Sequence, residues 1–348
     1  MYNVGIIGYG NMADYHFKKI FKPSSIKFYA AYDINKNRLE KAVNDGLVAY
    51  DNLDEMLNDE KVDVVLVSTP NDSHRDMAIK AMEKGKHVIC EKPVALNCEE
   101  LKSLISESEK RNVLFTVHQN RRLDRDFRIM KKIYDDNSLG GVFRIETRVQ
   151  GSREIAPTWR RNSENGGGML YDWGPHLIDQ ILYMVPFKVI SVYAEFQFIR
   201  QNEVDENIRL TLKFENGLSV LIEIGTCNYI MLPIWYMCGK EGSAQIDYWN
   251  LDGRMIKLIN KDIEFCDEIP STLVGPSITM APRNIDTVKE YPLPEPKYDK
   301  DLFYKNLFNA LEGTEELFVK PEEVLRTTSI IDMAFESGRD NKVIKCYI

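Results

Sequence analysis

The chain has 348 residues, of which 45 are Lys or Arg and 53 are Asp or Glu, so its net charge is −8; 44% of its residues are hydrophobic and 28% are charged. At about 150 residues per domain this length predicts two domains, and the composition excludes a disordered chain. The negative balance argues against a nucleic-acid or anionic-membrane partner, because both need a concentrated basic surface.

Cysteine usage and the amino-terminal segment bear on the compartment. The six cysteines are scattered without a CxxC pair, which favours a reduced interior over a zinc site or a disulfide framework. The first residues lack the basic region of a signal peptide, and no apolar run approaches the ~20 residues of a membrane helix. We therefore expect a cytoplasmic protein without a membrane partner.

The first third of the chain alternates short apolar runs with amphipathic segments. Strands are predicted at Val4–Ile7, Ile26–Tyr32, Val62–Val67, Lys86–Cys90 and Val113–Val117, and helices at Asn11–Phe21, Asn35–Asn44, Leu53–Asn58, Ser73–Lys84 and Asn97–Arg111. This alternation is typical of βαβ units, which form a parallel sheet with right-handed crossovers.

After about Gln119 the pattern becomes rich in strands. Helices are expected at Asp124–Tyr134, Pro175–Met184, Asp301–Leu311 and Pro321–Arg339, and strands at Val142–Gln150, Val189–Ile199, Asn207–Phe214, Leu218–Thr226, Ile234–Gly239 and Ala244–Tyr248, while residues 265–298 are expected to be irregular. Closely spaced strands with tight turns indicate a mainly antiparallel sheet. The fold class is therefore α/β. A doubly wound Rossmann domain (1–119) precedes an α+β domain (120–348) with a large, mostly antiparallel open sheet, whose closing helices are candidates to pack back on the first domain.

A glycine-rich turn follows the first predicted strand and opens the first helix. Its sequence, Gly8-Tyr9-Gly10-Asn11-Met12-Ala13, fits G-x-G-x-x-A. The first glycine allows a tight turn, the second lets the backbone approach a pyrophosphate, and the helix N-terminus attracts the phosphate charge. Because strand, turn and helix occur in the right order, we predict a dinucleotide site that includes residues 8–12.

Asp33 ends the second predicted strand, at close to the spacing of about 20 residues expected for a ribose-binding acid. A carboxylate there accepts hydrogen bonds from ribose hydroxyls and repels a 2′-phosphate, which favours NAD over NADP. Arg38 is a candidate to soften that repulsion, although the favoured reading of Arg38 is a solvated helix face beside Lys36 and Lys41.

Two further loops leave the carboxyl ends of predicted strands, where cofactors bind in doubly wound sheets. The first supplies the candidates Ser68, Thr69, Pro70, Asn71 and His74 for the cofactor cleft. The second, Cys90-Glu91-Lys92-Pro93, places a Lys-Pro pair where proline ends the ladder. We expect Glu91 and Lys92 to face the cofactor cleft, with the lysine ammonium directed across it.

The run Gly166-Gly167-Gly168-Met-Leu-Tyr-Asp172-Trp-Gly-Pro-His176-Leu-Ile-Asp179 completes the pattern. With the glycine turn and the E-K-P lysine, it resembles the Gfo/Idh/MocA family of oxidoreductases, which includes inositol, glucose and other sugar dehydrogenases. The resemblance covers essentially the whole chain. It implies that Lys92, Asp172 and His176 are the catalytic set, and that they also touch the substrate.

The chemistry of these side chains agrees with such roles. Oxidation of a secondary alcohol removes a proton from oxygen while a hydride leaves carbon, and histidine is suited to be the base near neutral pH. The lysine charge stabilises the developing alkoxide. Asp172 lies one helical turn before His176, where it orients the imidazole or binds a neighbouring hydroxyl.

The resemblance also implies residues that touch the substrate. Relatives carry an N-x-R segment that matches Asn120 and Arg122, although an interdomain ion pair is an equal reading of the arginines. Trp159 either covers a sugar ring or packs its loop. Asp172, His176 and Asp179 lack a fourth ligand, so we expect no metal. In the family the outer face of the second sheet commonly forms the subunit interface, which implies a homodimer or homotetramer.

We therefore expect an NAD(P)-dependent dehydrogenase that acts on a secondary hydroxyl of a sugar, a sugar derivative or a cyclic polyol such as an inositol. Two alternatives remain open. One is an NAD-dependent glycosidase, which oxidises a ring carbon transiently, eliminates the aglycone and returns the hydride. The other is a nucleotide-sensing regulator without enzymatic activity on the same fold.

Overall fold

The computed structural model describes residues 1–20, 23–200, 203–260, 283, 285–297, 299 and 301–348. Among these residues, every helix is too short or too polar to span a bilayer. The five cysteines in this part of the chain are free thiols, and Cys90 and Cys238 are buried.

The first sheet is parallel throughout and has the strand order β3-β2-β1-β4-β5-β6. Its strands are β1 (Tyr2–Ile7), β2 (Ile26–Tyr32), β3 (Val48–Tyr50), β4 (Val64–Val67), β5 (His87–Cys90) and β6 (Phe115–Val117). Parallel strands buried on both faces read as continuous apolar runs, and all four residues of β4 are fully buried.

Helices cross over between successive strands of this sheet. They are α1 (Asn11–Lys18), α2 (Lys36–Asn44), α3 (Leu53–Asn58), α4 (His74–Glu83), which follows the short η1 (Asn71–Ser73), and α5 (Cys98–Arg111). Three of these helices have side-chain caps: Asn35, Asn52 and Asn97 each accept a hydrogen bond from a backbone N–H in the first turn, as is typical of N-caps.

The second sheet has nine strands in the order β14-β13-β12-β11-β7-β10-β9-β8-β15. Every pair is antiparallel except β7–β10. Its strands are β7 (Val142–Gln150), β8 (Val189–Gln197), β9 (Asn207–Phe214), β10 (Ser219–Gly225), β11 (Trp235–Gly239), β12 (Gly242–Ile246), β13 (Gly253–Leu258), β14 (Val288–Tyr291) and β15 (Ile344–Lys345). The predicted fold class, a Rossmann sheet followed by a large and mostly antiparallel sheet, is confirmed.

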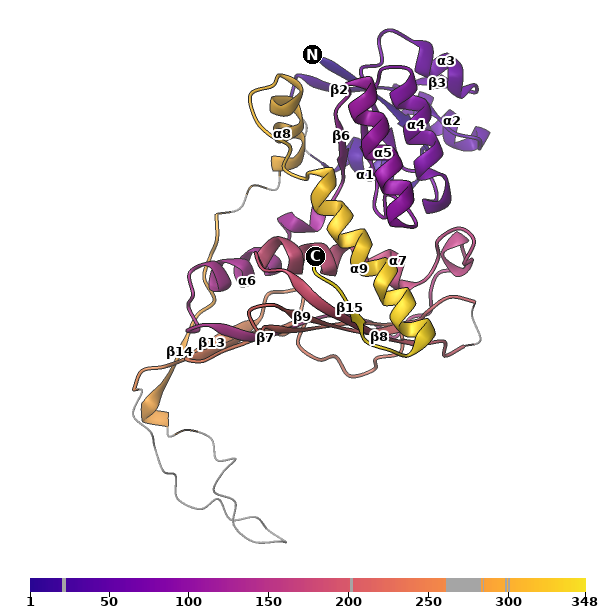
Figure 1. Cartoon of the computed structure of the whole chain (residues 1–348). Coiled ribbons are helices and arrows are strands. Elements are labelled where there is room, and N and C mark those ends of the chain that lie inside the picture. Colours follow the sequence, from indigo (N-terminus) through magenta and orange to yellow (C-terminus); the bar gives the residue numbers. More distant parts are fainter. Residues whose placement is uncertain (21–22, 201–202, 261–282, 284, 298, 300) are drawn as a thin grey trace.

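Helices of the second half cover one face of this sheet (Figure 1). They are α6 (Arg125–Asp135), α7 (Met169–Met184) and α9 (Pro321–Asp340), while η2 (Asn120–Leu123) connects β6 to α6 and η3 (Trp159–Arg161) precedes α7. Helix α7 packs against α9 and β10. The main hydrophobic core lies between this helix layer and the sheet.

The closing helix α8 (Leu302–Leu311) lies beside the first sheet (Figure 1). Its buried residues Phe303, Tyr304 and Leu307 join a core cluster with residues of β1 and β2. Helix α9 contacts α5 and β6, so it touches both halves of the molecule. We propose a division at residue 119/120 into a dinucleotide-binding domain and a domain for substrate and oligomerisation.

Several predicted boundaries differ from the structure. The helix expected at Asn11–Phe21 ends at Lys18, and Phe21 lies outside the described residues. Four strands were not predicted. Two of them, β3 and β15, are very short, and the other two, β13 and β14, pair with each other at one end of the sheet. Strand β14 corrects the irregular interpretation of 265–298, in which residues 265–282, 284 and 298 are outside the described part.

Candidate functional site at the carboxyl edge of the parallel sheet

The glycine turn lies between β1 and α1 as predicted. Gly8 has φ +88°, and a Cβ there would lie 2.9 Å from the carbonyl oxygen of Ser68, so no other residue fits. Gly10 is the N-cap of α1 and provides no side-chain cap. Asn11 is exposed and Met12 half-buried at the start of the helix.

Asp33 lies at the end of β2 and is 4% exposed. Its carboxylate accepts hydrogen bonds from the backbone N–H of Tyr9 (2.8 Å) and of Asn35 (2.8 Å). Nη1 of Arg38 lies 3.3 Å from the same carboxylate, although the Arg38 side chain is half exposed. The acid is therefore held against the glycine turn, with Arg38 as its counter-charge.

The loop after β4 is tied to its neighbours. The Ser68 hydroxyl donates to the carbonyl of Gly8 (2.8 Å), and Asn71 Nδ2 donates to the carbonyl of Gly166 (2.9 Å). His74 is buried, and its ring nitrogens lie 2.8 Å from the Pro93 carbonyl and 2.9 Å from that of Thr69. His74 thus joins the two loops beneath the cleft, while Pro70 is exposed.

Glu91 lies inside a buried hydrogen-bonded chain. Its Oε1 is 2.7 Å from His16 Nε2 and 2.9 Å from His118 Nδ1, and the Tyr304 hydroxyl lies 2.6 Å from His16 Nδ1. Burial alone would raise the pKa of Glu91, but His118 and His16 hold that pKa well below its usual range. The buried carboxylate is therefore ionised beside Lys92.

His16, Glu91 and His118 also have the residue types of a metal site, and their ligand atoms all lie within 4.8 Å of one another. The 2.7 Å and 2.9 Å separations are ordinary hydrogen-bond lengths, and the Tyr304 hydroxyl occupies the second His16 nitrogen. These distances fit a cluster whose side chains are joined by hydrogen bonds.

Helix α7 carries Asp172 and His176, and it begins six residues earlier than the predicted Pro175. The carboxylate of Asp205, distant in sequence, accepts a hydrogen bond from the N–H of Leu170 (2.7 Å) in the first turn. Gly168 has φ +101°, and a side chain there would collide with Asp205. Because this cap comes from another part of the chain, the local sequence did not reveal it.

Lys92 and Asp172 meet across the two halves of the chain. Lys92 Nζ donates to the Asp172 carbonyl oxygen (2.8 Å) and lies 3.3 Å from its carboxylate. Burial lowers the pKa of Lys92, and the carboxylates of Asp172 and Glu91 partly offset that effect. The carboxylate of Asp172 thus contacts the lysine, which differs from the expected orientation of the imidazole.

His176 follows one turn later and is 6% exposed. Its Nδ1 is buried and has no hydrogen-bond partner among the described residues. Burial, and then the charges of Lys92 and Arg121, hold the pKa of His176 well below its usual range. The ring is therefore neutral at neutral pH.

Arg122 lies in a buried ion-pair network. Its guanidinium donates to both carboxylate oxygens of Asp179 at 2.7 Å and to the carboxylate of Glu323 at 2.7 Å. The same guanidinium lies over the rings of Tyr183 and Phe318. With 1% of Arg122 exposed, this geometry supports the ion-pair alternative over substrate contact. Asn120 begins η2 and is half-buried.

The loop before α7 brings one more cation to the site. Nε of Arg160 lies 3.7 Å from the Asp172 carboxylate, and its guanidinium stacks over the ring of Trp159 at 4.5 Å. Trp159 itself is half-buried in η3. The structure therefore brings Arg160, rather than Trp159, to the Lys92–Asp172 pair.

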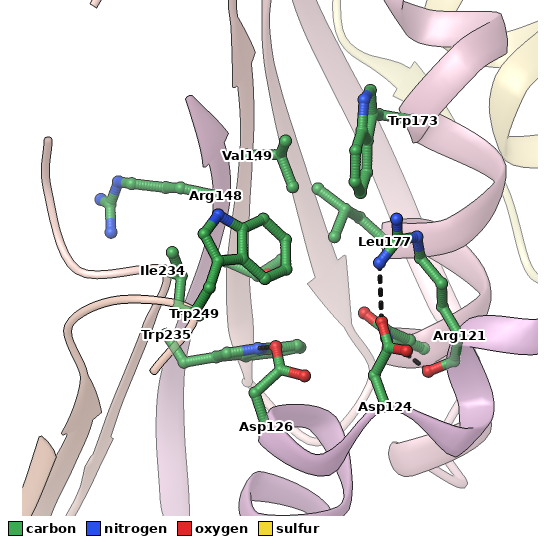
Figure 2. A pocket seen from close by; sticks show the side chains of 12 residues that line it. Arg121, Asp124, Asp126, Arg148, Val149, Trp173, Leu177, Ile234, Trp235 and Trp249 are labelled. Carbon is green, nitrogen blue, oxygen red and sulfur yellow. Dashed lines mark hydrogen bonds and ion pairs between the residues drawn. The ribbon is translucent and has the colours of Figure 1, made fainter. Parts of the chain in front are cut away.

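Beside α7 lies a hollow that the sequence did not reveal (Figure 2). It is small, with a volume of about 10 Å³, which is room for about one water molecule, and it is open to solvent. Its walls include Arg121, Asp124, Asp126, Thr147, Trp173 and Trp249. Three of these belong to the 121–126 segment and three come from distant elements, so no local sequence pattern marks them as neighbours.

The site fits a dinucleotide. Gly8 and the uncapped start of α1 leave backbone N–H groups free of side-chain caps for a pyrophosphate, and Asp33 is fixed beside them. Lys92 and His176 lie beyond, where the loop after β5 meets α7.

Comparisons with known proteins agree with this geometry. The model of an oxidoreductase family with an NAD-binding Rossmann fold (GFO_IDH_MocA) matches residues 2–119, and that of the GFO/IDH/MocA C-terminal domain matches residues 127–245. An oxidoreductase of Schizosaccharomyces pombe is 34% identical over 345 residues, which cover 93% of each chain.

Two further proteins are similar over nearly their whole lengths. The scyllo-inositol 2-dehydrogenase (NADP(+)) IolW of Bacillus subtilis is 28% identical, with 98% of this chain and 95% of that protein covered. The crystal structure of an NAD-binding protein from Listeria innocua superposes with a TM-score of 0.89 at 38% identity and covers 99% of this chain and 96% of its own. The similarity thus extends across both sheets.

Proposed function

Because this chain belongs to the GFO/IDH/MocA family of oxidoreductases and is an NAD-binding enzyme, we propose that it transfers a hydride between NAD and a secondary hydroxyl of a sugar, a sugar derivative or a cyclic polyol such as an inositol. The observation that carries the proposal is the meeting of Lys92 with α7 at the carboxyl edge of the parallel sheet.

In this proposal the cofactor is held by the turn at residues 8–12, by Asp33 and by the loops after β4 and β5. Backbone N–H groups at the start of α1 bind the pyrophosphate, and Asp33 accepts hydrogen bonds from the ribose. Ser68, Thr69 and Asn71 form the wall of the cleft. His74 acts from beneath by holding the loops, because its ring nitrogens are engaged by carbonyl groups.

Bound NAD supplies the hydride acceptor. As the hydride leaves the carbon and the C=O bond forms, the His176 imidazole takes the hydroxyl proton and becomes an imidazolium. The Lys92 ammonium donates a hydrogen bond to the same oxygen while negative charge develops there. Asp172 holds the ammonium in place through its carboxylate and its carbonyl. In the reverse direction His176 returns the proton.

The test is a panel of sugars and inositols with NAD and with NADP, in which the absorbance of the reduced cofactor is followed. We expect oxidation of at least one neutral polyol, faster with NAD than with NADP because Asp33 repels a 2′-phosphate. The glycosidase alternative is separated by a nitrophenyl glycoside: release of nitrophenol without accumulation of NADH would contradict the proposal.

We also propose a homodimer or homotetramer formed through the outer face of the second sheet. In support, α6, α7 and α9 cover one face of the sheet (Figure 1). The opposite face carries the row Tyr193, Thr211, Leu221, Glu146 and Tyr236 across five paired strands.

A further inference from the structure

The triple-glycine segment (166–168) lies between the two halves of the chain, directly before α7. A Cβ on Gly166 would lie 2.4 Å from the Leu96 side chain and 3.2 Å from that of Asn71, both in the first half. The carboxylate of Asp205, in the second half, would lie 2.3 Å from a Cβ on the last glycine. The absence of side chains therefore lets this backbone run in contact with both halves at once.

Two hydrogen bonds join the start of α7 to the two cofactor loops, which are residues 68–73 after β4 and residues 91–97 after β5. Nδ2 of Asn71, a residue that is 5% exposed, donates to the carbonyl oxygen of Gly166 (2.9 Å). The Tyr171 hydroxyl, in the first turn of α7, donates to the carbonyl oxygen of Leu96 (2.7 Å). Each cofactor loop therefore has its own hydrogen bond to the start of the helix that carries the proposed base.

Further contacts lie beside these two hydrogen bonds. Nδ2 of Asn165 donates to the carboxylate of Asp72 (2.9 Å) at the surface, and Nζ of Lys92 donates to the carbonyl oxygen of Asp172 (2.8 Å). The cofactor loops are also joined to each other, because the ring nitrogens of the buried His74 lie within hydrogen-bond distance of a carbonyl in each loop. The cofactor loops and the first turn of α7 therefore form one hydrogen-bonded unit.

A ligand that orders one part of such a unit also restrains the rest. Local opening of the first turn of α7 breaks its hydrogen bonds to the cofactor loops, and opening costs more free energy when a bound ligand holds those loops in place. NAD on the cofactor loops therefore restrains Asp172 and, one turn later, His176. Such coupling between two binding sites is reciprocal, so a substrate held by α7 also strengthens the binding of NAD.

We propose that Asn71 and Tyr171 are positioning residues that couple the binding of the cofactor to the placement of α7. Asn71 acts through the backbone of Gly166, and Tyr171 acts through the backbone of Leu96, so neither side chain has to touch the reacting atoms. This inference rests on the proposed dehydrogenase function and adds to it the contacts by which bound NAD holds the catalytic helix in its working position.

Hydrogen–deuterium exchange of the full chain, with and without NADH at a concentration that saturates each variant, tests this coupling without any substrate. In the wild type we expect NADH to slow the exchange of the amides of residues 166–172 by about tenfold. Asn71→Ala and Tyr171→Phe should each reduce that slowing by about fivefold, the effect of one hydrogen bond, and the double variant should abolish it. Tyr171→Phe keeps the ring, whose centroid is 5.0 Å from that of Phe335, so the packing of the helix is retained.

Tyr50→Phe is the matched control, because it removes a hydroxyl hydrogen bond of the same length (2.7 Å) whose partner, Asp59, also lies in the first half. Its NADH-dependent exchange should equal that of the wild type. With a substrate found in the panel, the double variant should lower kcat by about tenfold at saturating substrate and NAD, since α7 is misplaced, whereas Tyr50→Phe should not. Exchange of residues 166–172 that NADH leaves unchanged in the wild type, or slows equally in the wild type and the double variant, would overturn the coupling. If the panel contains no substrate, the dehydrogenase proposal fails, and the exchange experiment decides the coupling by itself.

Discussion

His176 is buried and Lys92 is partly buried, and burial lowers the pKa of each. On Lys92 the carboxylates of Asp172 and Glu91 partly offset the effect of burial on the pKa. On His176 the charges of Lys92 and Arg121 add to that effect. The neutral imidazole is therefore favoured on His176, as a general base requires, while the carboxylates limit the loss of the ammonium on Lys92.

Replacement of His176 by Gln tests the proposed base. The amide keeps a polar group of similar reach but accepts no proton, so kcat should fall by about 10²–10⁴-fold. NADH binding, followed by fluorescence, should stay within twofold of wild type because the residue lies on α7, outside the glycine turn. Full activity of His176→Gln would exclude its role as the base.

Glu91→Gln tests the buried counter-charge beside Lys92. Glu91 raises the pKa of Lys92, so its neutralisation should lower that pKa further. The rate is lost as pH rises through the pKa of Lys92, and the alkaline limb of the kcat profile should therefore move to lower pH.

Tyr304→Phe is the matched control for this change, because it removes the hydroxyl next to His16 and leaves the Glu91 charge in place. Its alkaline limb should coincide with that of the wild type. An equal displacement in both variants would show that the network acts through packing rather than through charge.

Among the elements, α7 has the most demanding position, because it presents Asp172 and His176 to a loop of the other sheet. Contacts that hold it include the Asp205 cap at its start, the Gly166–Asn71 hydrogen bond just before it, and the Asp179–Arg122 pair in its middle. Each partner comes from a different part of the chain, so the helix is fixed from several directions.

Arg122→Met should destabilise the protein by about 3–5 kcal/mol, because Asp179 is left as a buried charge without its partner. The free energy of unfolding in urea measures this loss. Arg125→Ala, an exposed position on the neighbouring helix, should change it by less than about 0.5 kcal/mol. A near-neutral Arg122→Met would mean that Asp179 is protonated or solvated in the native state.

Two glycines with positive φ, Gly8 and Gly46, allow the cost of backbone strain to be separated from the cost of steric overlap. Gly46 has φ +87°, and no atom lies within 4 Å of the position that a Cβ would take there, whereas a Cβ on Gly8 would meet Ser68 and Thr69. Gly46→Ala should cost about 1 kcal/mol of stability from strain alone, with unchanged NADH affinity.

Gly8→Ala should cost more stability than Gly46→Ala and should weaken NADH binding by at least about tenfold, because the loop that borders the cleft must move. Calorimetric titration of NADH into the two variants provides the comparison. Equal affinities would show that the turn does not approach the cofactor.

At the scale of the whole molecule, the helices of the described residues cover the second sheet on one side only (Figure 1). Analytical ultracentrifugation at micromolar concentration should therefore show a dimer or a tetramer. Tyr236→Arg, on the outer face, should weaken the assembly, since a like charge is introduced on both copies across a symmetric interface. A monomeric wild-type protein would contradict the proposed interface.

The sequence alone predicted the two-sheet fold, which the structure confirms, because hydrophobic periodicity and turn residues are local properties of the chain. It also identified Gly8, Asp33 and Lys92 as candidates, since each lies at a fixed offset from a strand end. Short strands such as β3 and β15 escaped prediction, because too few residues carry the pattern.

Only the tertiary structure decided which side chains meet. The Asp205 cap of α7, the contact of Tyr304 with His16, the burial of Arg122 between Asp179 and Glu323, and the hollow that includes Trp249 all join residues far apart in the chain. Such contacts depend on how helices and sheets pack, and packing is set by the whole core rather than by any local pattern. Local patterns in the sequence therefore predicted the fold and its candidate residues, whereas the packing determined the surroundings of Lys92 and His176.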